Sequence, residues 1–273
     1  MNANQRRVPV PKLKIIPLKN IHPHEESDPQ RSVPLIEKIR EATVFTNPPI
    51  VTAIENDQYV ILDGSNRCTS FMILGYDHIL VQIVDYDDGN VELDVWQHVI
   101  SGCDIDTFLR VLKNNSTLIT TEKPGTRQIA KIIFKDQQEA GIFASDKNIH
   151  KRNTILRELV HIYHENATLY RTALTDIEQI WELYPQSIAY IKFPVYTPND
   201  IIEAGRQQAF LPAGISRHII HGRVLKANYP LEHLKDNSLT LEEKNKQFQD
   251  WFQAKLAQKQ VRYYAEGTYQ FDE

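Results

Sequence analysis

Short apolar runs separated by polar turns fill the first 90 residues, a pattern that predicts alternating strands and helices. The clearest run, at residues 59–62, leads through Asp63-Gly64 into a helical pattern that ends at Gly75, a residue favoured just after a helix. The predicted order is β, α, β, β, α, β, with strands at 14–18, 49–54, 59–62 and 78–85 and helices at 32–42 and 65–75. This order predicts a small mixed α/β module.

The pattern beyond residue 100 is less regular. Thr175 and Thr240 each begin an S/T-x-x-E capping box, and Thr197 precedes a proline, so helices are predicted to begin at all three. The other predicted elements are helices at 104–112 and within 148–171, a hairpin of 129–134 with 141–144, and strands at 187–193, 215–225 and 261–269. Phe248, Trp251 and Phe252 have helical spacing, which predicts an apolar stripe that packs on the body of the protein.

These elements predict an α+β protein with two domains, residues 1–100 and 101–273. The length of 273 residues exceeds the common size of a single domain. No linker rich in Gly, Pro or Ser is visible, so we expect the domains to pack tightly with a cleft between them, where small ligands usually bind.

The composition is ordinary for a globular protein, with 41% hydrophobic and 24% charged residues. A net charge of −4 argues against a general nucleic-acid surface. Cys68 and Cys103 are too few for a disulfide framework or a four-cysteine zinc site and are typical of a reducing compartment. No apolar run is long enough to span a membrane, and no apolar segment follows the basic N-terminus. We expect a cytoplasmic protein.

The junction of the strand at 59–62 with the following helix is a candidate anion site. A helix N-terminus leaves N–H groups without partners and carries the positive end of the helix dipole. Arg67 lies one turn into the helix and can donate a charge-assisted hydrogen bond. The junction therefore predicts a phosphate site.

Two other segments carry polar groups of the same kind. His24-Glu25 lies in an exposed loop and is followed by Pro29 and Arg31. Far along the chain, residues 211–218 read LPAGISRH and continue to Gly222-Arg223. With the D-G-x-x-R motif at Asp63, the chain therefore has H-E-x-x-x-P-x-R, D-G-x-x-R and P-A-G-x-[ST]-R.

Together these segments resemble the free serine kinases built on a ParB/sulfiredoxin-like domain, which include bacterial siderophore-precursor serine kinases and archaeal ADP-dependent relatives. Trp96-Gln97-His98 and Thr126-Arg127-Gln128 extend the resemblance over most of the chain. D-G-x-x-R is shared with partition proteins, whereas P-A-G-x-[ST]-R is far more discriminating. The resemblance implies a ParB/sulfiredoxin-like N-terminal module and phosphorylation of free L-serine to O-phospho-L-serine, for siderophore or cysteine synthesis.

The resemblance also implies the roles of individual residues. Glu25 matches the family's general base, which takes the proton from the serine hydroxyl, and Glu26 is the second choice. The nucleotide phosphates are assigned to the residues of the junction, which are Asp63, Gly64, Ser65, Asn66 and Arg67. Many relatives have a histidine at the position of Asn66, and an amide cannot carry a proton's charge.

The late segment is implied to hold the serine. Ser216, Arg217 and His218 would hold the amino-acid carboxylate and the product phosphate, with Arg223 assisting, because a planar guanidinium binds a carboxylate in a bidentate manner. Trp96 matches a position near the substrate pocket.

ATP or ADP is the implied phosphate donor, with Mg²⁺ bridging its phosphates. No metal site of the protein's own is assigned. His161 and His164, with Glu165 beside them, match no known zinc-enzyme order and are interpreted as surface or core residues. Phosphoryl transfer depends mainly on positioning and charge neutralisation, so few catalytic side chains are needed.

The main alternative is a ParB-like DNA-binding or nucleotide-dependent regulatory protein without kinase activity. Such proteins add a basic helix-turn-helix and an arginine-rich motif, and neither is visible. A sulfinate reductase of the sulfiredoxin type needs a cysteine before the arginine of the phosphate loop, whereas Cys68 follows Arg67. A regulator that retains serine kinase activity stays open.

Overall fold

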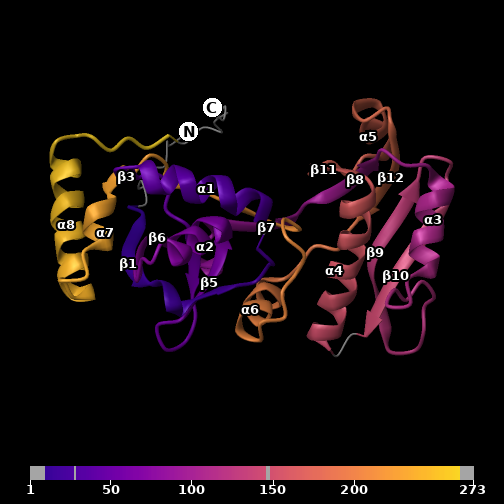
Figure 1. The fold of residues 1–273 in the computed structure, drawn as a ribbon, viewed down its shortest axis with the longest axis horizontal. Helices are drawn as coiled ribbons and strands as arrows, with labels where there is room; N and C mark the ends of the chain where they lie inside the picture. The colour runs from indigo at the N-terminus through magenta and orange to yellow at the C-terminus, as the bar shows by residue number, and fades with distance from the viewer. Residues whose placement is uncertain (1–9, 28, 146–147, 265–273) are drawn as a thin grey trace, which may run out of the picture. The chain divides into compact units, whose positions relative to one another are not determined.

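The computed structural model describes residues 10–27, 29–145 and 148–264 (Figure 1). The chain divides into two compact units. The first unit is Met1–His22, Ser27–Glu92 and Ile220–Glu273, and the second unit is Pro23–Glu26 and Leu93–Ile219. This division differs from the boundary expected at residue 100, because the segment that begins at Ile220 belongs with the first unit.

The first unit is built on a five-stranded sheet with the order β1-β6-β4-β5-β2. Its strands are β1 (Lys12–Pro17), β2 (Ile21–Pro23), β4 (Ile50–Ala53), β5 (Tyr59–Asp63) and β6 (His78–Val84). β4 runs parallel to β6, while β1 with β6 and β4 with β5 are antiparallel. The helices are α1 (Pro29–Glu41), α2 (Ser65–Ile73), α7 (Leu231–Lys235) and α8 (Leu241–Ala257). The short strands β3 (Val44–Phe45) and β14 (Tyr229–Pro230) pair, and 3-10 turns lie at Leu18–Asn20 and Tyr86–Asp88.

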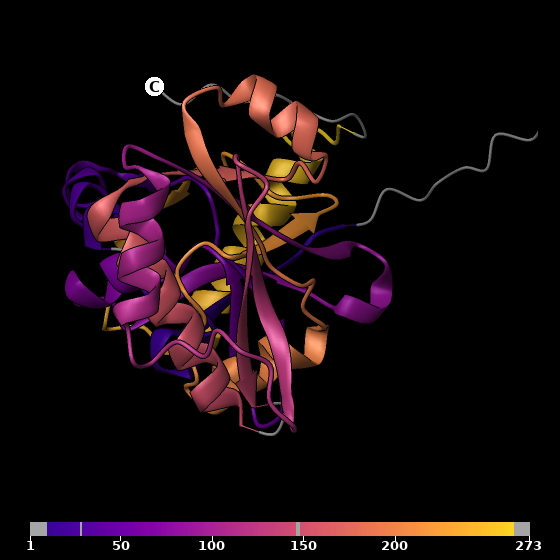
Figure 2. The same cartoon turned by 90° about the vertical axis from the view of Figure 1, so that its right-hand side faces the viewer.

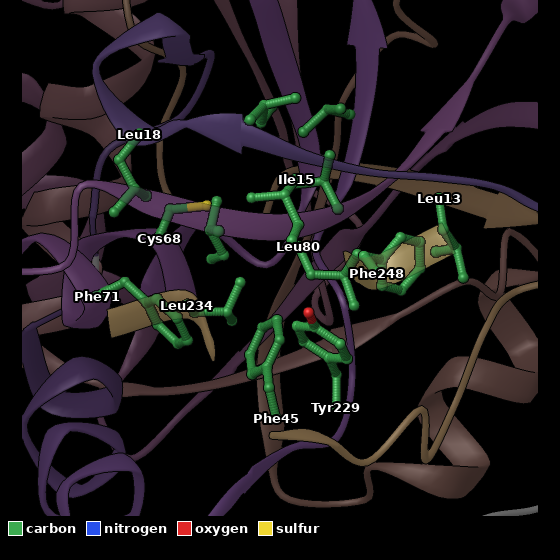
Figure 3. Packing of buried hydrophobic residues seen from close by; sticks show 14 of the residues in the cluster. Leu13, Ile15, Leu18, Phe45, Cys68, Phe71, Leu80, Tyr229, Leu234 and Phe248 are labelled. Carbon is green, nitrogen blue, oxygen red and sulfur yellow. The ribbon is translucent and has the colours of Figure 1, made fainter. Parts of the chain in front are cut away.

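Residues from both ends of the chain share the core of the first unit. Tyr229 and Phe248 are fully buried and their rings lie 5.3 Å apart, in the same cluster as Phe45 and Leu80 (Figure 3). Asn245 on α8 hydrogen-bonds both the N–H and the C=O of Ile15 on the edge strand β1, at 2.9 and 2.8 Å. The predicted apolar stripe of α8 is therefore confirmed as core, and it explains why the C-terminal segment belongs to this unit.

The second unit contains another five-stranded sheet, with the order β10-β9-β12-β8-β11. Its strands are β8 (Gln97–Ser101), β9 (Thr126–Phe134), β10 (Glu139–Ser145), β11 (Thr168–Thr172) and β12 (Ser187–Lys192). Its helices are α3 (Ile105–Asn114), α4 (Ile149–Asn166), α5 (Ile177–Leu183) and α6 (Pro198–Arg206). α3 and α4 pack on each other and lie on the same side of β9 and β10 (Figure 2). The strands β7 (Val91–Val95) and β13 (Ser216–Ile220) pair. Each of these two strands contains a boundary at which the chain changes from one unit to the other.

Most local predictions hold, with differences at element ends. Thr197 and Thr240 are the N-caps of α6 and α8, as predicted, whereas α5 is capped by Asp176 in place of Thr175. The strand expected at 215–225 is shorter, because it ends at Ile220 before the turn at Gly222. The strand expected at 261–269 is absent over 261–264, and its other residues lie outside the described part of the chain. Among the described residues no helix has the length and hydropathy to cross a membrane.

The cap of α6 gives a stability prediction for the second unit. The Thr197 hydroxyl accepts the N–H of Asp200 at 3.2 Å, and the Asp200 carboxylate accepts the N–H of Thr197 at 3.0 Å. Thr197→Ala removes the hydroxyl and leaves the Asp200 N–H without its partner. The substitution is expected to lower the free energy of unfolding by about 1 kcal/mol. Urea denaturation measures the change, and Thr197→Ser is the matched control that keeps the hydroxyl. Equal midpoints for the alanine and serine variants would contradict the prediction.

Candidate active site

The Glu25 carboxylate is held by the P-A-G-x-S segment of the second unit. Gly214 N–H donates to Glu25 Oε2 at 2.7 Å. Ser216 donates twice to Glu25 Oε1, from its N–H at 2.7 Å and from its hydroxyl at 2.6 Å. A parallel bridge between Glu25 and Leu211 aligns the two segments, with Leu211 N–H donating to the His24 carbonyl at 2.8 Å. The backbone and the side chain of Glu25 are therefore both fixed by one segment.

His24 completes this cluster. It is buried, with 3% of its surface exposed, and its Nε2 lies 2.7 Å from Ser216 Oγ. Because the Ser216 hydroxyl gives its one proton to Glu25, its oxygen accepts from His24, which requires the Nε2–H form of the ring. The His218 ring meets the His24 ring edge-on at 5.6 Å. Ser216 thus contacts the carboxylate and the imidazole together.

Arg217 and Trp96 form a second contact in the same unit. The Arg217 guanidinium lies over the Trp96 ring at 4.7 Å from its centroid and pairs with Asp94 at 2.8 Å. Trp96 N–H donates to the Ile215 carbonyl at 2.9 Å, which ties the junction of β7 and β8 to the P-A-G-x-S segment. The arrangement presents a planar cation beside Ser216.

The D-G-x-x-R motif lies in the first unit, where β5 ends and α2 begins. Arg67 and Arg223 both donate to Asp63 Oδ2, at 2.9 and 2.8 Å, and Arg67 also donates to the Asn47 carbonyl. Gly64 is the N-cap residue with a φ of +95°, and a Cβ built there would lie 2.7 Å from Arg67 Nη2. Only glycine therefore leaves room for this arginine position.

Two arginines on one carboxylate determine the charge of this cluster. Burial by itself would raise the pKa of Asp63, but the Arg67 and Arg223 charges and hydrogen bonds hold that pKa below its usual value. Asp63 is therefore ionised at neutral pH, and the cluster has one excess positive charge. With the N-terminus of α2 beside it, where Ser65 and Asn66 form the first turn, the cluster suits an anion with several oxygens.

Cys68, His161 and Glu165 were given no catalytic or metal-binding role, and their environments can be described individually. Cys68 is buried, and burial raises the pKa of its thiol to about 12, so it is not a nucleophile. His161 and Glu165 are exposed and pair on α4 at 3.3 Å. Within residues 10–27, 29–145 and 148–264 no group of three or more His, Cys, Asp or Glu side chains could hold a metal.

The structure groups the predicted residues into two sets. Glu25, Trp96, Ser216, Arg217 and His218 belong to the second unit, and the first unit holds Asp63 to Arg67 and Arg223. Glu26, the second choice of base, pairs with Arg157 at 3.0 Å. Sequence reasoning did not single out Asn47, Asp94 or Gly214 N–H as contacts, because single residues and backbone groups leave no motif.

Comparison with known proteins decides the family. No family model matches the chain. An ATP-dependent L-serine kinase of Staphylothermus marinus is 32% identical over 237 residues, which cover 81% of this chain and 90% of the relative. The chain belongs to the family of ATP-dependent L-serine kinases. The resemblance predicted from the three segments is thereby confirmed.

Similarity to a second curated relative and to solved structures extends over most of the chain. The ATP-dependent L-serine kinase SbnI of Staphylococcus aureus is 25% identical over 260 residues, 94% of this chain and 96% of SbnI. A solved structure of C-terminally truncated SbnI matches with a TM-score of 0.70 at 23% identity, covering 91% of this chain and 97% of that one. A free serine kinase in complex with AMP matches with a TM-score of 0.68 at 18% identity, covering 81% and 93%. These likenesses show that the mixed α/β fold is shared.

Proposed function

We propose that this protein transfers the terminal phosphoryl group of a nucleotide to the hydroxyl of free L-serine, forming O-phospho-L-serine. Family membership supports the reaction, and the carboxylate of Glu25, fixed by Gly214 and Ser216, is the observation that carries it. The names of the curated relatives favour ATP over ADP as the donor. Solved free serine kinase structures in which one glutamate is replaced, in complex with AMP or ADP, also support a carboxylate role.

The hydrogen bonds of Glu25 favour one oxygen as the base. Each carboxylate oxygen accepts about two hydrogen bonds, and Oε1 already accepts two from Ser216. Oε2 accepts one, from Gly214, so within the described residues it keeps an acceptor position. The hydroxyl of the substrate L-serine gives its proton to Glu25 Oε2 while its oxygen attacks the terminal phosphorus. When ATP is the donor, ADP leaves with the electrons of the broken P–O bond.

The cluster of Asp63, Arg67 and Arg223 is proposed to hold the nucleotide phosphates, with backbone N–H groups of Ser65 and Asn66 at the start of α2. Asp63 orients both guanidinium groups through Oδ2, and the arginines neutralise charge that develops on the phosphate oxygens. We infer that the first unit, which holds this cluster, is a module of the ParB/sulfiredoxin type.

Mg²⁺ fits this donor set as an ion carried by the nucleotide. Such ions are usually held by substrate phosphates and one or two carboxylates. Asp63 Oδ1 has no hydrogen bond within the described residues, so it can serve as that carboxylate oxygen. When bound, Mg²⁺ would neutralise phosphate charge.

The structure changes the roles that we propose on the serine side. The Ser216 hydroxyl is engaged by Glu25 and His24, so we propose that it positions the base. Arg217 uses one Nη for Asp94, and its other donors suit the amino-acid carboxylate beside Trp96 and His218. With two cysteines in 273 residues, we propose a cytoplasmic location.

The reaction is tested with the purified full chain, L-serine, Mg²⁺ and either ATP or ADP. We expect phosphoserine, detected by mass spectrometry, together with one nucleotide product for each phosphoserine formed. Nucleotide incubated without serine is the control for simple hydrolysis. If neither donor yields phosphoserine, the proposed function is wrong.

A further inference from the structure

Residues 209–216, which we call the base loop, are fixed from several sides within the second unit. Asn153 Nδ2 donates to the Ala209 carbonyl and Arg157 Nη1 to the Phe210 carbonyl, both from α4. The bridge to Glu25 holds Leu211. These contacts fix the beginning of the base loop, while Ala213 and Gly214, next to the carboxylate, lie beyond their reach.

Arg171 supports that remaining part. It lies on the edge strand β11 opposite His98 of β8, and its Nη2 donates to the Ala213 carbonyl at 3.0 Å. A Cβ built on Gly214 would lie 2.4 Å from Arg171 Cζ, so the guanidinium packs directly against the Gly214 backbone. Gly214 has a φ of +71°, and its N–H is the donor to Glu25 Oε2. Arg171 therefore donates to the carbonyl of the same Ala213–Gly214 peptide group whose N–H binds Glu25 Oε2.

The strand partner of Arg171 on β8 is an uncharged histidine. His98 is fully buried, and its Nδ1 lies 2.6 Å from the Tyr163 hydroxyl. Burial first, and then the Arg171 charge, lower the pKa of His98 to about 3, so this ring is neutral. Arg171 therefore lies opposite a neutral ring, whose own position is fixed by Tyr163.

We infer that Arg171 is a positioning residue for the base: it fixes the Ala213–Gly214 turn, and through the Gly214 N–H it fixes the proton-accepting oxygen of Glu25. The inference rests on the proposed serine kinase function. A misplaced general base slows the chemical step more than it weakens substrate binding. Loss of Arg171 should therefore appear in kcat.

The test compares Arg171→Ala, Arg171→Lys and the wild type in steady-state phosphoserine formation. We expect Arg171→Ala to lower kcat about tenfold, with the KM for serine and for nucleotide changed less than about twofold. Guanidinium chloride at low millimolar concentration should restore part of the kcat of the alanine variant, because the ion can occupy the vacated space. Arg206→Ala, which removes an exposed arginine paired with Glu203, is the control and should keep wild-type kcat.

Folding and function are separated within the same experiment. If Arg171→Ala does not fold, Arg171→Lys tests the inference in its place. Lysine keeps the charge but cannot lie against Gly214 and bind the Ala213 carbonyl at the same time. The kcat of this variant should fall severalfold at unchanged KM. Three outcomes would overturn the inference. The first is wild-type kcat in the variants, and the second is a rise in the KM for serine with kcat unchanged. The third is a loss of kcat that follows a lower melting temperature and is not rescued by guanidinium. A wild type that forms no phosphoserine overturns the proposed function instead.

Discussion

Glu25→Gln is expected to lower kcat for phosphoserine formation by about 10³-fold, while the Kd for nucleotide stays unchanged. A general base contributes about 10²- to 10⁴-fold, and glutamine has nearly the shape of glutamate but cannot accept the proton. The phosphate cluster is made by Asp63, Arg67 and Arg223, which bond to one another in the first unit, whereas Glu25 belongs to the second unit. Steady-state kinetics and calorimetric nucleotide binding measure the two quantities.

Glu26→Gln is the matched control for this experiment. Glu26 is the adjacent carboxylate, but it is largely exposed and pairs with Arg157. We expect its kcat to stay within about twofold of wild type. A larger loss in Glu26→Gln than in Glu25→Gln would reverse the assignment of the base.

Arg67→Ala is expected to weaken nucleotide binding by about 10- to 100-fold. The guanidinium is held by Asp63 and the Asn47 carbonyl at the start of α2, and a hydrogen bond to a charged group contributes about 1.5–3 kcal/mol. Because the lost interaction is electrostatic, the difference from wild type should shrink as salt is added. Titration calorimetry at two salt concentrations measures both effects.

The control for the arginine is another arginine of the first unit. Arg40 is exposed on α1 and pairs with Glu37, so Arg40→Ala changes the net charge equally without touching the cluster. Its nucleotide affinity should equal that of the wild type. An unchanged affinity in Arg67→Ala would remove the phosphate role of this residue, whatever the Arg40 variant shows.

The first module was predictable because its signals are local. The Asp63-Gly64 turn and Gly75 mark the ends of β5 and α2, and both glycines have positive φ in the structure. The strand β8 was missed, although it lies inside the second sheet. Its Gln97 and His98 look polar but are buried with partners: Gln97 bonds the backbone of Phe193 and His98 meets Tyr163. Hydropathy cannot detect a buried strand whose polar side chains find partners inside the protein.

Contacts between distant segments were predictable only where both segments carry a recognisable sequence motif. Glu25 and Ser216 were both singled out although 191 positions separate them, because each lies in a recognisable segment. Asp94 and Arg171 lie in no such segment, so only the folded structure connects them with Arg217 and Ala213. The membership of residues 220–273 in the first unit likewise depends on packing of Phe248 and Tyr229, which no local pattern encodes.

The discontinuous first unit has a consequence for synthesis on the ribosome. Domains usually fold in the order in which they emerge, with the N-terminal one first. Here the residues of the second unit have all been translated at Ile219, while the first unit still lacks Tyr229 and Phe248 of its core. The core of the first unit therefore stays incomplete until α8 has been synthesised, so the second unit, in the middle of the polypeptide, can fold before the first.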